Sequence, residues 1–314
     1  MTIDWQECFQ KGCIGAFGAI PGTVAAHPLD LTKIRLQLST MTTTTTTTAT
    51  SATSTPHSSF HFFRAAAQQT WQNPTAGLGS AVQQKVLTRG PMFLASAACT
   101  QLIQDHAPTT WSRTVSVTAG SWVSGFLTGC IASPAEWAKV QQGIMQQQQQ
   151  QQSKQQQSAL RLVSSSIRHG NTLSLLRRIR GAGLRNGIFD ATFFGTEHSL
   201  QQLGGTGTGT TGWPQSQSVR FALAAVAAVI VDYPVDAAVK RSMAVGSHQV
   251  VAYGPLQATY RFVVHDCQLS LTRVYRGLSC KGLEFAVSYF CTGAVAPWVV
   301  AGFAAATAAA VAQD

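Results

Sequence analysis

A proline followed two residues later by an acidic residue occurs three times in this chain, each time at the end of an apolar run. The three copies are Pro28-Leu-Asp30, Pro134-Ala-Glu136 and Pro234-Val-Asp236. They lie 106 and 100 residues apart, whereas the repeats of solenoids and propellers span about 20–50 residues. The spacing therefore indicates three copies of a larger unit.

Each copy follows a segment rich in small apolar residues, and a polar connection then leads to a second apolar segment. The second segments cover roughly 86–104, 183–200 and 282–312. Two helices per unit predict an all-α membrane protein of six transmembrane helices in three pseudo-repeats around a central cavity. We place the units at 1–105, 106–205 and 206–314, with a Thr/Ser-rich insertion at 40–59 and a Gln-rich insertion at 145–157. Both insertions are low-complexity tracts that we expect to be disordered.

Charge and composition support a membrane setting. Only 11% of residues are charged, against about 25% in soluble domains. The net charge is +10, but the basic residues lie between apolar runs, so we expect anionic lipid or an anionic solute and no nucleic acid. Charged residues inside the apolar segments, such as Arg185 and Glu284, indicate that the helices surround water.

The sequence offers no catalytic or metal-binding constellation. The seven cysteines form no CxxC pair and the eight histidines are dispersed, so we expect neither an enzyme nor a metal or cofactor site. The N-terminus has acids at Asp4 and Glu7 and no basic region, which does not fit a secretory signal or an Arg-rich transit peptide.

The charges after each proline suit a gate. Asp30 and Lys33 are three residues apart, hence on one helix face. If the proline bends each helix inward, an acid of one helix meets a base of the next, and the ring opens when the pairs separate. The alternative is an ordinary helix end whose charges reach outward to the membrane interface.

The triple motif resembles the mitochondrial carrier family, whose hallmark is Pro-x-[Asp/Glu]-x-x-[Lys/Arg]-x-[Lys/Arg] in each of three repeats. The resemblance implies a gate on the matrix side, formed by Pro28, Asp30, Lys33, Arg35, Gln37, Pro134, Glu136, Lys139, Pro234, Asp236, Lys240 and Arg241. It pairs Asp30 with Lys139 and Asp236 with Lys33. The chain departs from the pattern where Gln141 and Val239 replace bases, so Glu136 lacks its partner.

The same resemblance implies short matrix-side helices, alternating access across the inner mitochondrial membrane, a monomer, and bound cardiolipin; some relatives of the fold serve peroxisomes or plastids. The lipid site is expected at Tyr275, Arg276 and Gly277, where a helix start and a cation suit a phosphate. On the opposite side the family's aromatic-acid-x-x-base element is missing, because Glu197 has no base three residues on. We therefore expect that side to close by packing.

For the substrate, the stretch ATFFG at 191–195 resembles a family element that places Arg185 and Asn186 at the selective position. In carriers, Arg followed by a small polar residue there goes with carboxylate or keto-acid substrates, and a guanidinium suits such an anion. The corresponding positions in the other units are near Arg89 and near Lys281 and Glu284.

Three alternatives stay open. Arg185 could instead form a structural pair with Asp190 or Glu197. Opposite charges in one cavity also suit a zwitterion, which would make the protein an amino-acid carrier. A degenerate carrier-like scaffold or receptor without transport is the third.

Overall fold

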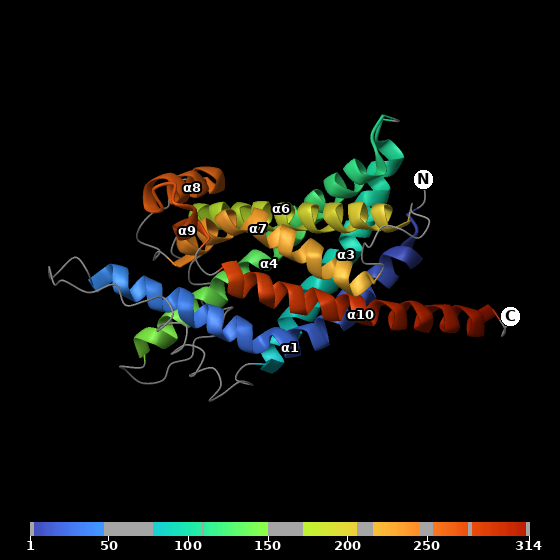
Figure 1. The fold of residues 1–314 in the computed structure, drawn as a ribbon, viewed down its shortest axis with the longest axis horizontal. Helices are drawn as coiled ribbons and strands as arrows, with labels where there is room; N and C mark the ends of the chain where they lie inside the picture. Colours follow the sequence, from blue (N-terminus) through green and yellow to red (C-terminus); the bar gives the residue numbers. More distant parts are fainter. Residues whose placement is uncertain are drawn as a thin grey trace.

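The structure is a computed structural model that describes residues 3–46, 78–108, 110–149, 172–205, 216–244, 254–275 and 278–311. Within these ranges the regular structure is entirely helical (Figure 1). The long helices are α1 (Trp5–Thr46), α3 (Leu78–His106), α4 (Arg113–Gln149), α6 (Thr172–Gly205), α7 (Gln217–Ala244) and α10 (Leu278–Val311). Between the last two lie α8 (Pro255–Arg261), a π-helical turn η1 (Phe262–Asp266) and α9 (Leu271–Val274).

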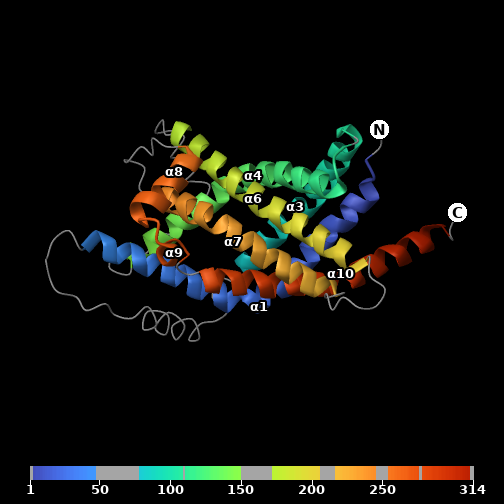
Figure 2. The same cartoon turned by 45° about the horizontal axis from the view of Figure 1, so that its top comes forward.

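The long helices form a closed ring. Each packs against the next in chain order, and α10 returns to pack against α1. Both ends of the chain lie at one end of the bundle, while α8 and α9 lie at the other (Figures 1 and 2). This arrangement directs the interior faces of all the long helices toward a common axis.

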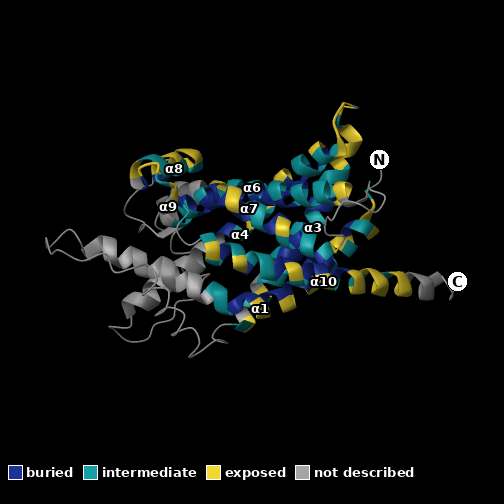
Figure 3. Cartoon of the chain, in the orientation of Figure 1, coloured by how far each residue is buried: buried dark blue, intermediate teal, exposed yellow. Residues whose placement is uncertain are grey.

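Three helices are long and apolar enough to cross a membrane, by length and composition, among the residues described. These stretches are Arg113–Ser133, Gln217–Lys240 and Leu278–Ala306. Their outer faces carry exposed apolar side chains such as Ile131 and Trp298, which are 81% and 80% exposed. Figure 3 shows exposed residues in the C-terminal half of α10, up to the point where the ribbon turns grey. An apolar outer surface of this kind suits lipid better than water.

The helices extend further than their apolar segments. Helix α1 continues through Pro28 to Thr46 and α7 continues through Pro234, so neither proline ends its helix. The expectation of disorder was wrong for the first part of each polar tract: α1 ends inside the threonine run and α4 ends at Gln149. Once a helix has nucleated, adding residues at its end costs little. Residues 47–77 and 150–171 lie outside the described ranges.

Glycines bring α1 against α10 with almost no space between the backbones. A Cβ atom on Gly18 would lie 2.6 Å from Cγ2 of Thr292, and one on Gly22 would overlap the carbonyl oxygen of Ser288. Small residues allow such close approach between helices in membranes. The ring therefore closes through a glycine face on its first helix.

Aromatic side chains fill the middle of the bundle. Phe93 from α3, Phe193 from α6, Phe221 from α7 and Tyr289 from α10 form one buried cluster. The ring centroids of Phe193 and Tyr289 are 4.5 Å apart, and those of Phe93 and Phe221 are 6.2 Å apart. Phe221 lies near the start of α7, so this layer is on the side of the chain termini, and the charged residues later in α7 lie on the side of α8.

Candidate functional site

A cluster of buried charges surrounds Asp236 in the second half of α7. Its Oδ2 accepts hydrogen bonds from Lys281 Nζ of α10 at 2.8 Å and from Lys240 Nζ at 2.9 Å. Its Oδ1 lies 3.4 Å from Nη1 of Arg185 on α6. The Asp236 residue is only 3% exposed. Three cations from three helical positions thus converge on one carboxylate.

Lys281 binds a second carboxylate as well. Its ammonium donates to Oδ2 of Asp232 at 3.1 Å, one helical turn before Asp236 on α7. The rings of Tyr233 and Phe285 lie 5.6 and 5.7 Å from the same nitrogen. Carboxylates on two consecutive turns and two aromatic faces therefore fix the position of this ammonium.

Arg185 is held by its neighbour in the sequence. Its Nε and Nη2 donate to Oδ1 of Asn186 at 3.0 and 2.7 Å. The amide thereby orients the guanidinium, whose Nη1 remains directed at Asp236. A guanidinium fixed in this way is prepared to bind a carboxylate in a defined geometry.

Two further cations lie on α3, facing α10. Lys85 Nζ is 3.6 Å from Oε1 of Glu284 and 5.3 Å from the centroid of the Phe285 ring. Arg89 donates to Oγ of Ser288 at 2.8 Å and to Oγ1 of Thr292 at 3.2 Å, and its guanidinium lies 4.2 Å from the Tyr289 ring. Both of these hydrogen bonds are accepted by hydroxyl groups, although Arg89 is only 4% exposed.

The structure places the residues expected to bind substrate in two groups. Arg185, Asn186 and Lys281 lie together around Asp236. Glu284 and Arg89 lie along the interface between α3 and α10, where Glu284 pairs with Lys85. Whether these residues bind a substrate stays a prediction.

The alternative partners proposed for Arg185 do not bind it. Arg185 pairs with Asp236, and Glu197 instead pairs with Arg220 of α7 at 3.8 Å. Asp190 is fully enclosed, and its Oδ2 has no hydrogen-bond partner in the described part of the chain. The pair of Glu197 and Arg220 supplies an ionic contact near the termini that sequence spacing did not predict.

Most side chains of the predicted gate lie outside the described part of the chain. The side chains outside the described part are those of Lys33, Arg35, Gln37, Pro134, Glu136, Lys139 and Arg241, and residues Arg276 and Gly277 lie outside it altogether. The pairing of Asp30 with Lys139 and of Asp236 with Lys33 therefore stays a prediction. In the described part, Lys240 binds Asp236 of its own helix, and Val239 is buried with Gly181 of α6 beside it.

Sequence reasoning missed two charged residues of this region. Asp232 precedes Asp236 by four residues on α7, so helical spacing places it on the same face as a predicted residue. Lys85 precedes Arg89 by four in the same way. A search for charges one turn from each predicted site residue would have found both.

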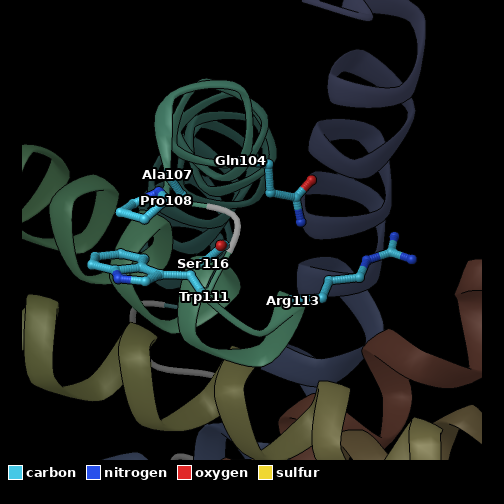
Figure 4. Close-up of a pocket in the computed structure, with 6 residues that line it drawn as sticks. All are labelled: Gln104, Ala107, Pro108, Trp111, Arg113 and Ser116. Atoms are coloured by element: carbon cyan, nitrogen blue, oxygen red, sulfur yellow. The ribbon is translucent and has the colours of Figure 1, made fainter.

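The cluster is closed to solvent in this conformation. Arg185 is 8% exposed and Lys281 is 3% exposed. The surface pocket drawn in Figure 4 has a volume of about 450 Å³ and lies elsewhere, at the connection between α3 and α4. It is lined by Gln104, Ala107, Pro108, Trp111, Arg113 and Ser116 and shares no residue with the cluster. An occupant of the charged cluster therefore needs a conformational change to enter.

Part of the sequence matches a known protein family. Residues 4–107 match the family model described as mitochondrial carrier protein. The match spans α1 and α3, about a third of the chain, and includes the first Pro-x-acid motif. Over these residues it confirms the resemblance to the mitochondrial carrier family. No curated protein matches the sequence.

The matched family indicates the kind of activity to consider. Mitochondrial carriers are solute transporters of membranes and not enzymes. The helical bundle, the three stretches apolar enough to span a membrane and the enclosed charges are consistent with that activity. The residues around Asp236 are accordingly the candidate site for a transported solute.

Proposed function

We propose that the carrier transports a small carboxylate or keto-acid metabolite by alternating access. The observation that supports this most directly is the convergence of Arg185 and Lys281 on the carboxylate of Asp236. The two cations come from α6 and α10, and between them they bind both oxygens of one carboxylate. A substrate carboxylate that replaces Asp236 would find the same two donors.

The charges nearby favour an anion. Arg89 adds a buried guanidinium that donates hydrogen bonds to the hydroxyl groups of Ser288 and Thr292. Lys85 adds a further cation opposite Glu284. A guanidinium or ammonium that is shielded from water gives an anion a strong charge-assisted hydrogen bond.

The test is uptake by the purified full-length carrier in liposomes. Radiolabelled pyruvate, 2-oxoglutarate and a neutral amino acid are offered separately, with and without the same solute inside. We expect uptake of a carboxylate, and we expect Arg185→Ala to abolish it. Arg113→Ala is the matched control, because Arg113 is exposed at the start of α4 and far from the cluster in sequence. Equal carboxylate uptake by wild type and Arg185→Ala would reject the assignment, and no uptake of any solute would favour the scaffold alternative.

One observation favours an amino acid as the second candidate. The ammonium of Lys281 lies between the carboxylates of Asp232 and Asp236, so this place accepts an amino group. A zwitterion would use these acids for its ammonium and Arg185 for its carboxylate. Uptake of the amino acid in preference to both keto acids would decide for it.

We further propose that the carrier is a monomer in the inner mitochondrial membrane, with six spans in three units around a central site. Cardiolipin is the expected bound lipid, at Tyr275, Arg276 and Gly277, because a helix start with a cation suits its phosphates. Cardiolipin should then raise the melting temperature of the purified carrier, and Arg276→Ala should reduce that shift. An unchanged shift in the variant would remove the assignment.

A further inference from the structure

Two buried carboxyl groups near the cluster have an oxygen without a hydrogen-bond partner in the described part of the chain. They are Asp190 of α6 and Asp232 of α7, each 2% exposed, and the atoms concerned are Oδ2 and Oδ1 respectively. The other oxygen of Asp232 is bonded to Lys281. An ionised carboxylate is costly in such surroundings unless a cation compensates it. Among the described residues, Lys281 is the cation bonded to Asp232.

Asp236 differs from Asp232 in this respect. Lys240 and Arg185 bind it in addition to Lys281, so it keeps cationic partners when Lys281 moves away. Asp232 and Asp236 lie one turn apart on α7 and compete for the same ammonium. The two acids are thus unequal, and Asp232 is the one that is left uncompensated.

The remaining charged groups around Asp232 do not replace Lys281. From α6, Arg185 and Asp190 act on it electrostatically, one with each sign. The described charged side chains elsewhere on the elements packed against α7 are exposed; they are Arg113 of α4, Arg261 of α8, His265 of η1 and, on α6, Arg180. None of these is bonded to Asp232. Glu284 on α10 pairs with Lys85, and Glu197 on α6 with Arg220.

We propose that Asp232 is a proton site that couples anion transport to proton transport. The inference rests on the proposed binding of an anion at Arg185 and Lys281. When a substrate carboxylate takes the ammonium of Lys281, Asp232 loses its cation. A proton from water then forms an O–H bond with the Asp232 carboxylate, and no electrons are exchanged. When the anion leaves, Lys281 returns to Asp232 and the proton is released to the same side.

A consequence is that the anion and the proton cross the membrane together. For a monocarboxylate the transported pair carries no net charge, so membrane potential does not drive it. A gradient of one pH unit then supports an accumulation ratio of about tenfold, because about 1.4 kcal/mol corresponds to a factor of ten. Uptake should be faster when the outside is the acidic side.

The experiment uses the full-length carrier in liposomes that contain a pH-sensitive dye, with the potential clamped by potassium and valinomycin. Pyruvate is the probe, and its uptake is measured at equal pH and with the outside one unit more acidic. For wild type we expect about tenfold greater accumulation with the gradient and one proton entering per anion. For Asp232→Asn we expect pyruvate to accumulate to the same level with the pH gradient as without it. We also expect no proton entry.

Two variants serve as controls. Asp190→Asn tests the neighbouring carboxyl and should retain the wild-type ratio of protons to anions, whereas Asp232→Glu should restore coupling because it keeps a carboxyl at this position. Loss of coupling in Asp190→Asn, with coupling intact in Asp232→Asn, would overturn the assignment to Asp232. Wild-type pyruvate uptake without proton entry would overturn the inference while leaving the proposed function standing. Absence of anion uptake under every condition would reject the proposed function itself.

Discussion

The ammonium nitrogen of Lys281 lies 2.8 Å from Oδ2 of Asp236 and joins α10 to α7 across 45 residues of sequence. The same nitrogen lies 3.1 Å from Oδ2 of Asp232. All three side chains are at most 4% exposed. One buried cation thus compensates two buried acids, and the stability of this region depends on it.

Replacing Lys281 by methionine should destabilise the protein strongly. Breaking a buried ion pair from one side leaves an uncompensated charge and costs about 3–5 kcal/mol. Asp232→Asn in the same chain should recover part of this loss, because Asp232 has lost its bonded cation, with an interaction free energy of about 1–3 kcal/mol. Denaturant unfolding of the two single variants and the double variant in detergent measures the cycle. Additive effects would show that the two side chains are not coupled.

Arg185→Lys should slow anion uptake although it keeps the positive charge. A lysine cannot donate to Asn186 and to a carboxylate through one planar group. Losing one hydrogen bond to a charged group corresponds to about 1.5–3 kcal/mol, or a rate about 10- to 150-fold lower. Initial rates of pyruvate uptake into liposomes give the value. Rates equal to wild type would mean that the orientation set by Asn186 has no role.

Gly22→Ala should destabilise the contact between α1 and α10. The added methyl group would overlap the carbonyl oxygen of Ser288, and overpacking of this kind costs about 1–3 kcal/mol. Gly282→Ala is the matched control, because a Cβ there meets no atom within 4 Å. We expect this control to be neutral or slightly stabilising, since alanine favours helix over glycine. If the melting temperature changes by the same amount in both variants, the close contact between α1 and α10 is contradicted.

Phe193→Ala should open a cavity in the aromatic layer. The side chain is fully buried, and its ring contacts those of Phe221 and Tyr289. Truncating a buried phenylalanine costs about 3–5 kcal/mol. Phe290→Ala is the control, because that ring is 46% exposed on α10 and should change stability by less than about 0.5 kcal/mol. The unfolding free energies of both variants in one detergent provide the comparison.

The repeated motif predicted the helical bundle and several members of the charged cluster. Periodicity identified Asp236, and the local resemblance around residues 191–195 identified Arg185 and Asn186, which the fold brings together. The Pro-x-acid motif is repeated and the stretch at 191–195 is local, so both can be recognised in a single sequence.

The partners of these residues were harder to predict. Lys281 was expected to be significant because it lies a turn from Glu284, but it binds Asp232 and Asp236 on another helix. Which cation pairs with which acid depends on how each helix is rotated about its axis and how far it is shifted along the bundle. The spacing of residues in the sequence gives neither quantity. Helix ends were also misjudged, because hydrophobicity marks the part that meets lipid or the core, whereas helix propagation continues into polar residues at Thr46 and Gln149.

The close contact of Gly18 and Gly22 with Thr292 and Ser288 bears on how the protein is made. The first helix is synthesised long before its partner, since these contacts join opposite ends of the chain. Contacts so distant in sequence form late in folding. During translation the glycine face of α1 has no permanent neighbour, and the ring is incomplete until α10 leaves the ribosome. The contact between the two helices therefore forms only after α10 has been synthesised.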